Sequence, residues 1–505
     1  MSLKKNTIAN YFGQGWTALM GLAFIPVYIR YLGMEAWGLV GFMSMMQAWL
    51  TLLDMGLSPT LSREMARFSA GAHSAQSIRN LLRSLEIIYG GVALAVVLVV
   101  WLAAPWLVDY WLKVEHLPRQ EVVQAIIMMG LVLAARMGEQ VYRGAIQGLQ
   151  HQVWLNAAQS VLATLRWGGA VGVLVWVSPT IEAFFLWQGW VSLLTVAVFA
   201  IQTYRWLPKA ENAGRFDTGE LKLIHRFAGG MAATTLLTLL LTQVDKLLLS
   251  KLLPLEQFGY YTLAASVAGA LYFLVSPLSI AISPRLTGLV TQADHTTLVT
   301  TYHRASQWMA AILVPPALVM AGFAEPLLWA WTGDTALAQR AAPLLTLLAL
   351  GTMCNGFMHV PYMMQLAHGW TSFAVRVNIV AVVIIVPAIF WAVPRFGAVG
   401  AAWAWLALNA GYVLIGIHFM HRRLLPDEKW RWYREAIIQP LIVGGVVTVL
   451  MMLVWPMTDR LSAALLLILV ATATAVAVAA ATPEPRIFLL RQVLRIRGKF
   501  AHGNQ

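Results

Sequence analysis

The strongest constraint on this chain is a long series of apolar stretches. Fourteen stretches of about 20 mostly apolar residues, the length of a helix that crosses a lipid bilayer, follow one another through the 505 residues. Charged residues make up only 11% of the chain, against about 25% in soluble domains. We therefore predict an all-α polytopic membrane protein. The predicted spans are approximately 7–29, 36–57, 87–108, 122–142, 153–177, 183–204, 227–250, 258–284, 308–331, 341–367, 377–394, 398–420, 436–457 and 461–481.

The basic residues indicate how the chain lies in the membrane. With the N-terminus in the cytoplasm, 25 of the 35 lysines and arginines fall on the cytoplasmic side and seven on the outer side. Cytoplasmic loops of membrane proteins carry such an excess. We therefore predict that both termini are cytoplasmic, and that the net charge of +13 reflects this asymmetry and no nucleic-acid partner. The opening residues run directly into a long apolar span, so we expect no cleaved signal peptide.

The sequence offers little support for an enzyme or a metal site. The single cysteine, Cys354, excludes intramolecular disulfides and a zinc site built from cysteines. The chain has no P-loop, no H-E-x-x-H and no G-x-S-x-G motif. No connection between spans is longer than about 30 residues, and the longest show no strand pattern. We expect no extramembrane domain, catalytic residue, cofactor or bound metal.

Two short hairpins recur at a spacing of 221 residues. Residues 30–38 read RYLGMEAWG and residues 251–259 read KLLPLEQFG, so a basic residue, Leu, Glu, an aromatic residue and Gly coincide. The pattern alone is also that of a common interfacial hairpin. Because six spans separate the copies, we predict two lobes in the same orientation, related by rotation about the membrane normal. The predicted organisation is a six-helix lobe at 1–204, a cytoplasmic linker at 205–226, a second six-helix lobe at 227–420, and two further helices with a basic cytoplasmic tail at 421–505.

Several short motifs, in their order and spacing, resemble a known family. The motifs are residues 10–38 with Pro26, DMGLSP at 54–59 followed by Arg63, AIQGLQ at 145–150, and DKLLLS at 245–250 leading to FGYY at 258–261. They cover most of the chain. The sequence resembles the polysaccharide transporters of the multidrug/oligosaccharidyl-lipid/polysaccharide flippase superfamily, and within them the O-antigen and capsule-unit flippases.

This resemblance implies a fold and a substrate class. It implies two lobes around a central cavity that opens to either side of the membrane in turn. The implied substrate is an undecaprenyl-pyrophosphate-linked oligosaccharide, which crosses the bacterial inner membrane. Besides this substrate and membrane lipids, the resemblance leaves open a coupling ion, either a proton or sodium, and an association with glycan polymerase machinery. It does not identify the sugar.

Arg166 is the costliest charge in the predicted spans. An ionisable residue at the centre of a bilayer costs roughly 2.5–3.5 kcal/mol on insertion scales. Arg166 lies near the middle of 153–177, and that span contains no acidic residue. Its guanidinium can bind a pyrophosphate in bidentate geometry, or it can form a structural ion pair with an acid on another helix.

Two further pairs of charges lie in or near predicted spans. Arg136 and Glu139 are three residues apart on one helical face, where they can neutralise one another. Their position toward the cytoplasmic end also suits a gate, with Glu139, or an entry site for the phosphate, with Arg136. Asp245 and Lys246 are adjacent, so they diverge by about 100° on a helix and cannot face the same direction. One of the two can therefore face a cavity while the other reaches a neighbour or the headgroups.

Four more residues are candidates for a gate or for coupling. Asp54 ends the second span nine residues before Arg63, and Glu325 lies near the outer end of the ninth span. A helix-terminal position explains Asp54 and Glu325 without a function. His359 lies deep within a span beside Asn355. It can carry a proton near neutral pH, or it can be a hydrogen-bonded packing residue.

Two other functions are compatible with parts of this pattern. A cation-coupled multidrug antiporter of the same superfamily is expected to place a coupling carboxylate in its first or seventh span. The first span here has none, whereas Asp245 lies in the seventh. A polytopic glycan polymerase or glycosyltransferase is expected to have a sizeable outer loop. The outer loops here reach only about a dozen residues, which argues against that alternative.

Overall fold

The computed structural model describes residues 3–54, 56–208, 212–219, 235–236, 239–240, 242–454 and 459–491. This part of the chain consists of helices joined by short loops, and its only β-type pairing is an isolated bridge between Lys113 and Pro254. Within it, eleven helices are long and apolar enough to cross a membrane. The prediction of an all-α polytopic membrane protein is confirmed, and about fourteen spans are consistent with the structure. The first part of the predicted span 227–250, residues 227–234, lies outside the described residues, as do 237–238 and 241.

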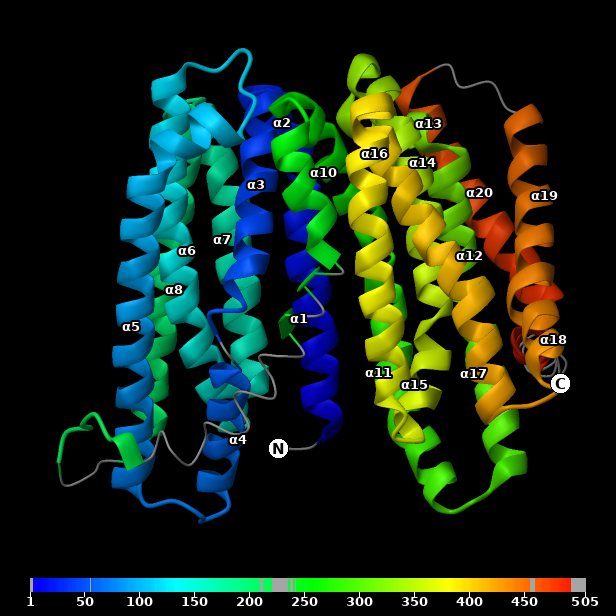
Figure 1. Ribbon diagram of the computed structural model, residues 1–505, viewed down its shortest axis with the longest axis horizontal. Coiled ribbons are helices and arrows are strands. Elements are labelled where there is room, and N and C mark those ends of the chain that lie inside the picture. Colours follow the sequence, from blue (N-terminus) through cyan, green and yellow to red (C-terminus); the bar gives the residue numbers. More distant parts are fainter. Residues whose placement is uncertain are drawn as a thin grey trace, which may run out of the picture. The chain divides into compact units, whose positions relative to one another are not determined.

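The chain divides into two compact units, Met1–Gly259 and Tyr260–Gln505. In the first unit, α6 packs extensively against α5 and α8, and α1 runs along α7 (Figure 1). The elements of this unit are α1 (Leu3–Ala23), α2 (Ile25–Leu32), α3 (Met34–Leu50), α4 (Leu57–Ser69), α5 (Ala75–Trp106), η1 (Leu107–Trp111), α6 (Arg119–Gly148), α7 (Gln152–Trp176), α8 (Ile181–Trp206), helical residues 242–252, and the beginning of α10 (Leu255–Gly269).

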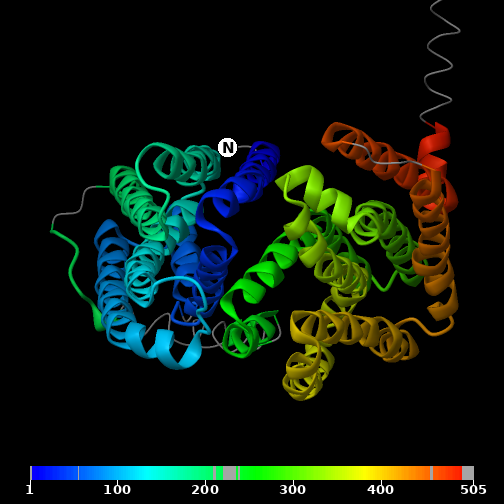
Figure 2. The same cartoon turned by 90° about the horizontal axis from the view of Figure 1, so that it is seen from above.

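The second unit is built around α12, which packs against α14, α11 and α20. Its core includes Leu313, Val314 and Ala317 of α12, all fully buried. Figure 2 looks along the helices of this unit. Its further elements are α11 (Tyr272–Thr291), α12 (His295–Gly322), α13 (Ala324–Thr332), α14 (Thr335–Phe357), α15 (His359–Ala367), α16 (Thr371–Gly411), η2 (Tyr412–Gly416), α17 (Ile417–Leu424), α18 (Lys429–Trp432), η3 (Tyr433–Ile438), α19 (Gln439–Val454) and α20 (Arg460–Ala481).

Some helices end or bend at glycines, at positions that the predicted spans did not include as breaks. Gly33 and Gly56 have positive φ angles of 82° and 69°, which glycine adopts without the steric cost of a Cβ. Gly33 separates α2 from α3, and Gly56 precedes α4. The predicted span 36–57 therefore ends early, since α3 stops at Leu50. In the second unit, Gly397 (φ 59°) kinks α16 between the predicted spans 377–394 and 398–420.

The two copies of the repeated hairpin pack against each other. α3 begins at Met34 and α10 begins at Leu255, residues that differ by the same 221 positions. A Cβ on Gly38 would lie 2.3 Å from the backbone oxygen of Leu255, and a Cβ on Gly259 would lie 2.6 Å from that of Met34. Each glycine thus faces the first residue of the other helix, and the contact is reciprocal. The lobes at 1–204 and 227–420, and the segments at 205–226 and 421–505, stay predictions.

Candidate functional site

The charges of the first unit meet in a cluster between α6, α7 and α8. The Arg166 Nη2 on α7 lies 3.3 Å from Glu139 Oε2 on α6 and 3.4 Å from Thr195 Oγ1 on α8. The side chains of Arg166 and Glu139 are 15% and 17% exposed. The cost of placing Arg166 inside the membrane is therefore reduced by an acid from another helix, one of the two alternatives that the sequence left open.

Arg136 occupies the same cluster but has amide partners. Its Nη1 donates to the side-chain oxygen of Gln47 on α3, and its Nη2 lies 3.5 Å from Gln188 Oε1 on α8. Arg136 is 9% exposed, and Gln188 is fully buried. Within the described residues Arg136 forms no ion pair. The predicted direct ion pair with Glu139 is therefore not formed, because Arg166 of the neighbouring helix pairs with that carboxylate, which remains a charged neighbour of Arg136.

The cluster carries one positive charge in excess. The charged neighbours of Arg136 are Arg166 and Glu139, so two guanidiniums share one carboxylate. Among the described residues, three buried donors here lack a hydrogen-bond partner, namely Arg136 Nε, Arg166 Nε and Gln188 Nε2. Buried donors without partners cost about 1–3 kcal/mol each. An anion that reached this cluster would neutralise the excess charge and accept hydrogen bonds from these groups.

Asp54 lies in a separate buried site near the start of α4. Its Oδ1 accepts hydrogen bonds from the Tyr89 hydroxyl and from the backbone N–H of Ser58, the latter at 3.3 Å. Asp54 is 8% exposed. A carboxylate at the N-terminal end of a helix is stabilised by the helix dipole and by free backbone N–H groups. Asp54 thus links the start of α4 to Tyr89 of α5.

The remaining candidates lie on helices other than α6, α7 and α8. Lys246 donates to the backbone oxygen of Thr242 in its own helix, at 3.2 Å, and the adjacent Asp245 is 8% exposed. Arg63 lies on α4, with its Nε 3.6 Å from Glu64 Oε1. Glu325 is exposed in the first turn of α13, a position that the helix dipole favours.

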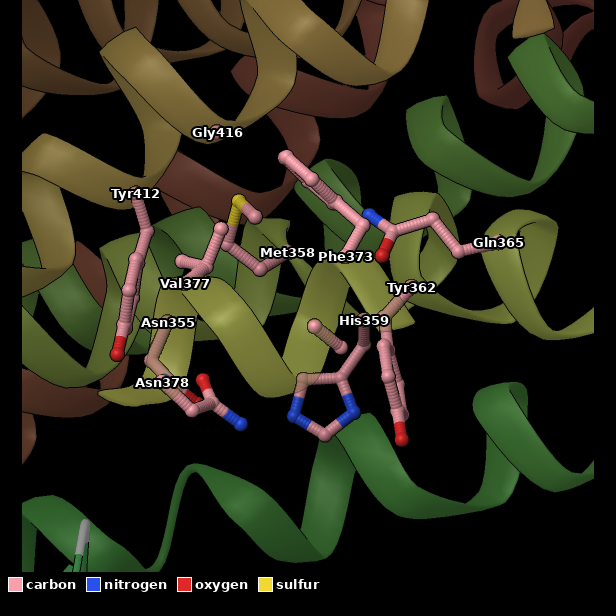
Figure 3. Close-up of a pocket in the computed structure, with 11 residues that line it drawn as sticks. Asn355, Met358, His359, Tyr362, Gln365, Phe373, Val377, Asn378, Tyr412 and Gly416 are labelled. Atoms are coloured by element: carbon pink, nitrogen blue, oxygen red, sulfur yellow. The ribbon is translucent and has the colours of Figure 1, made fainter. Parts of the chain in front are cut away.

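His359 lies in the second unit, at the first residue of α15. Its Nδ1 is 3.4 Å from the Ser279 hydroxyl of α11. Figure 3 shows its imidazole in a pocket together with Asn378 and Tyr362. No group of three or more His, Cys, Asp or Glu side chains in the described part of the chain is placed to hold a metal ion.

Comparison with known families identifies the chain. Residues 3–290, more than half of its length, match a family described as "Polysaccharide biosynthesis protein". The chain belongs to this family. A second family, MatE, matches residues 231–391. A protein of Shigella flexneri described as "Putative O-antigen transporter" is 19% identical over 405 residues, which are 80% of this chain and 94% of that protein.

Solved structures show the fold that this polysaccharide biosynthesis protein shares. "Lipid II flippase MurJ, inward closed conformation" matches with a TM-score of 0.70 and 12% identity, over 97% of this chain and 99% of that one. An inward-facing multidrug resistance MATE family transporter of the MOP superfamily matches with a TM-score of 0.63 and 12% identity, over 84% and 95%. This family member therefore has the MurJ and MATE fold, and the predicted membership of the flippase superfamily is confirmed.

Four polar residues that bind the candidate side chains were not predicted from the sequence. Gln47, Gln188 and Thr195 bind the two arginines, and Tyr89 binds Asp54. Each is a neutral polar residue within an apolar helix. Their positions within apolar spans could have predicted such contacts, because a polar side chain in a membrane needs a hydrogen-bond partner.

Proposed function

We propose that this protein carries an undecaprenyl-pyrophosphate-linked oligosaccharide across the bacterial inner membrane by alternating access, and that it catalyses no chemical reaction. The oligosaccharide would be a repeat unit of an O-antigen, a capsule or an exopolysaccharide. The polysaccharide biosynthesis family, the Shigella flexneri relative and the flippase fold support this class of substrate. The proposal includes cytoplasmic termini, as the basic residues predict.

The observation that carries the proposal is the excess positive charge of the Arg136–Glu139–Arg166 cluster. A pyrophosphate is the part of the substrate that is most costly to place within a membrane. Arginine binds phosphate oxygens through two parallel N–H donors, and such bonds strengthen where water is excluded. Arg166 is partly exposed, so it is the group that a pyrophosphate would reach first.

Glu139 provides a way to release the substrate again. Its Oε2 lies 3.3 Å from Arg166 Nη2. A bound pyrophosphate would replace Glu139 as the partner of the Arg166 guanidinium. The Arg166–Glu139 ion pair would form again when the substrate leaves. Arg136, which has no acidic partner of its own among the described residues, would keep the cluster attractive to the anion throughout this exchange.

Deletion of the gene in its native host tests this function. The lipid-linked oligosaccharide should accumulate on the cytoplasmic face of the inner membrane, and the corresponding surface polysaccharide should disappear. A plasmid copy should restore the polysaccharide, whereas an Arg166→Gln copy at equal membrane abundance should not. An unchanged surface polysaccharide and lipid pool in the deletion strain would refute the proposal.

A cation-coupled multidrug antiporter is the second candidate function. The MatE family matches residues 231–391, and this range contains Asp245, a buried carboxylate on a membrane helix. An antiporter would lower the drug susceptibility of its host and would need an ion gradient. The Asp245→Asn variant distinguishes the two functions, because it should abolish drug export by an antiporter while flipping by way of the arginine cluster continues.

A further inference from the structure

The second unit contains a pocket whose chemistry differs from that of the arginine cluster. Its volume is about 210 Å³, and it lies between α14, α15, α16 and η2. The helices are irregular here. α14 ends at Phe357 and α15 begins at His359, while Tyr412 and Gly416 belong to a π-helical turn. Such π-helical turns are frequently found at functional sites.

Among the described residues, the polar lining of this pocket contains no carboxylate, ammonium or guanidinium group. It consists of amides, hydroxyls and one imidazole, contributed by Asn355, His359, Tyr362, Gln365, Asn378 and Tyr412. In Figure 3 the Asn378 amide, the His359 imidazole and the Tyr362 hydroxyl point toward the same side of the group. A site for a phosphate would need cationic groups, so this lining is unsuited to the anionic part of the proposed substrate.

Part of the lining is held in place by hydrogen bonds. The Asn355 amide nitrogen donates to Asn409 Oδ1 at 2.8 Å, and its oxygen accepts from the Tyr272 hydroxyl at 3.1 Å. Asn409 in turn donates to the Trp405 backbone oxygen at 2.8 Å. This chain of bonds fixes the orientation of the Asn355 amide, so that side of the pocket is formed before any ligand enters.

The other polar groups of the lining are left for a ligand. Within the described residues, the side chains of Tyr362, Gln365, Asn378 and Tyr412 have no hydrogen-bond partner. Gln365 is only 3% exposed. Amides and hydroxyls both donate and accept hydrogen bonds, so they match the neighbouring hydroxyls of a sugar. Phe373 and the tyrosine rings add apolar surface, which suits the C–H faces of a pyranose.

We propose that this pocket is a glycan subsite, which binds a neutral pyranose of the oligosaccharide that the protein carries. The inference rests on the proposed function. It assigns the two chemical parts of the substrate to two sites of different chemistry, and it makes the second unit the source of sugar specificity. The same fold can then serve different polysaccharides by changing a few neutral side chains.

Binding of a free sugar tests the subsite directly. The probe is the oligosaccharide released by mild acid from the lipid carrier of the native host, added to the purified full-length protein and followed by saturation-transfer NMR. The Tyr412→Phe and Gln365→Leu variants should each weaken binding about fivefold, the effect of one lost hydrogen bond. Because neither side chain has a partner among the described residues, both variants should keep the wild-type melting temperature.

A matched control and a competing ligand complete the test. Tyr110 is 73% exposed outside the pocket, so Tyr110→Phe removes a similar hydroxyl and should leave binding unchanged. Equal binding by the wild type, Tyr412→Phe and Gln365→Leu would overturn the subsite. So would binding of the lipophilic cation tetraphenylphosphonium in the pocket with no binding of the sugar.

Transport in cells separates failure of the subsite from failure of the proposed function. The host supplies either the complete lipid-linked repeat unit or a lipid that carries only its first sugar. The double variant Tyr412→Phe/Gln365→Leu should move the complete unit more slowly and the short lipid at the wild-type rate. If the wild type moves both and the double variant matches it, only the subsite is wrong. If the wild type moves neither, the proposed function is wrong.

Discussion

Arg166 and Glu139 form an ion pair between α7 and α6, with Nη2 and Oε2 3.3 Å apart. Glu139 therefore pairs with Arg166 and not with Arg136, which lies three residues before it on the same helix. Arg136 keeps only the amide oxygens of Gln47 and Gln188 as partners in the described structure. One carboxylate thus lies beside two buried guanidiniums, and the proposed anion site rests on this imbalance.

Substitution of Arg166 separates substrate binding from structural pairing. Lysine keeps the charge but loses the planar fork, and glutamine loses both, so transport should fall in the order Arg, Lys, Gln. Breaking a buried ion pair costs about 3–5 kcal/mol, and less where the pair is partly exposed, as here. Complementation of a flippase-deficient strain, normalised to membrane abundance, measures transport.

The Arg166→Gln/Glu139→Gln double variant is the control. It removes both partners, so its abundance should recover to the wild-type level while transport stays low. Recovery of transport together with abundance would show that Arg166 is a structural residue only.

The Asp54 site should respond as an anchor of α4. Tyr89→Phe and Asp54→Asn each disturb a buried hydrogen bond, so we expect each to lower the free energy of unfolding by about 1–3 kcal/mol. The melting temperature of the purified protein measures this effect, and transport per folded molecule should persist. The opposite result, an unchanged melting temperature with loss of ion-driven transport in Asp54→Asn, would make Asp54 a coupling carboxylate.

The reciprocal glycine contact should not tolerate a methyl group. In Gly38→Ala, the new Cβ would clash with the Leu255 backbone oxygen, which should destabilise the protein by about 1–3 kcal/mol. Gly15→Ala in α1 is the matched control, because its Cβ would meet nothing within 4 Å and alanine favours a helix. The melting temperature of Gly38→Ala should therefore be lower than that of Gly15→Ala. Equal melting temperatures would show that the contact does not contribute to stability.

Much of the fold could be predicted because the span of a membrane helix is set by the thickness of the bilayer. The break after Leu50 could not, because Leu52 and Leu53 continue the apolar run, and the charged and turn-forming residues Asp54 and Gly56 come only after them. The predicted spans that begin at 36 and 258 start close to α3 and α10, which begin at Met34 and Leu255.

The site was predictable only in part. Arg166 stood out by its cost in the membrane, but its partner depends on which helices are neighbours, and local spacing suggested the wrong pair. Gln188 and Gln365 are neutral, so their insertion cost did not single them out. Their roles follow from the packing of distant segments, which no local pattern encodes.

Cysteine labelling checks the predicted orientation. In a Cys354→Ser background, His116→Cys should be labelled by an impermeant thiol reagent in cells with a permeabilised outer membrane, because His116 is exposed in the loop between α5 and α6. Asn212→Cys, which is also exposed, should be labelled only after the inner membrane is opened. The reverse pattern would place both termini outside.

Reconstitution tests the central claim most directly. Proteoliposomes that contain the purified protein and the fluorescent undecaprenyl-pyrophosphate-linked oligosaccharide are treated with an external glycosidase, which reaches only the outer leaflet. We predict that the wild type makes the inner-leaflet substrate accessible, whereas the Arg166→Gln/Glu139→Gln variant leaves it protected, as in liposomes without protein. Protection of the inner-leaflet substrate in wild-type proteoliposomes, or equal exposure by the double variant, would contradict flipping through the arginine cluster.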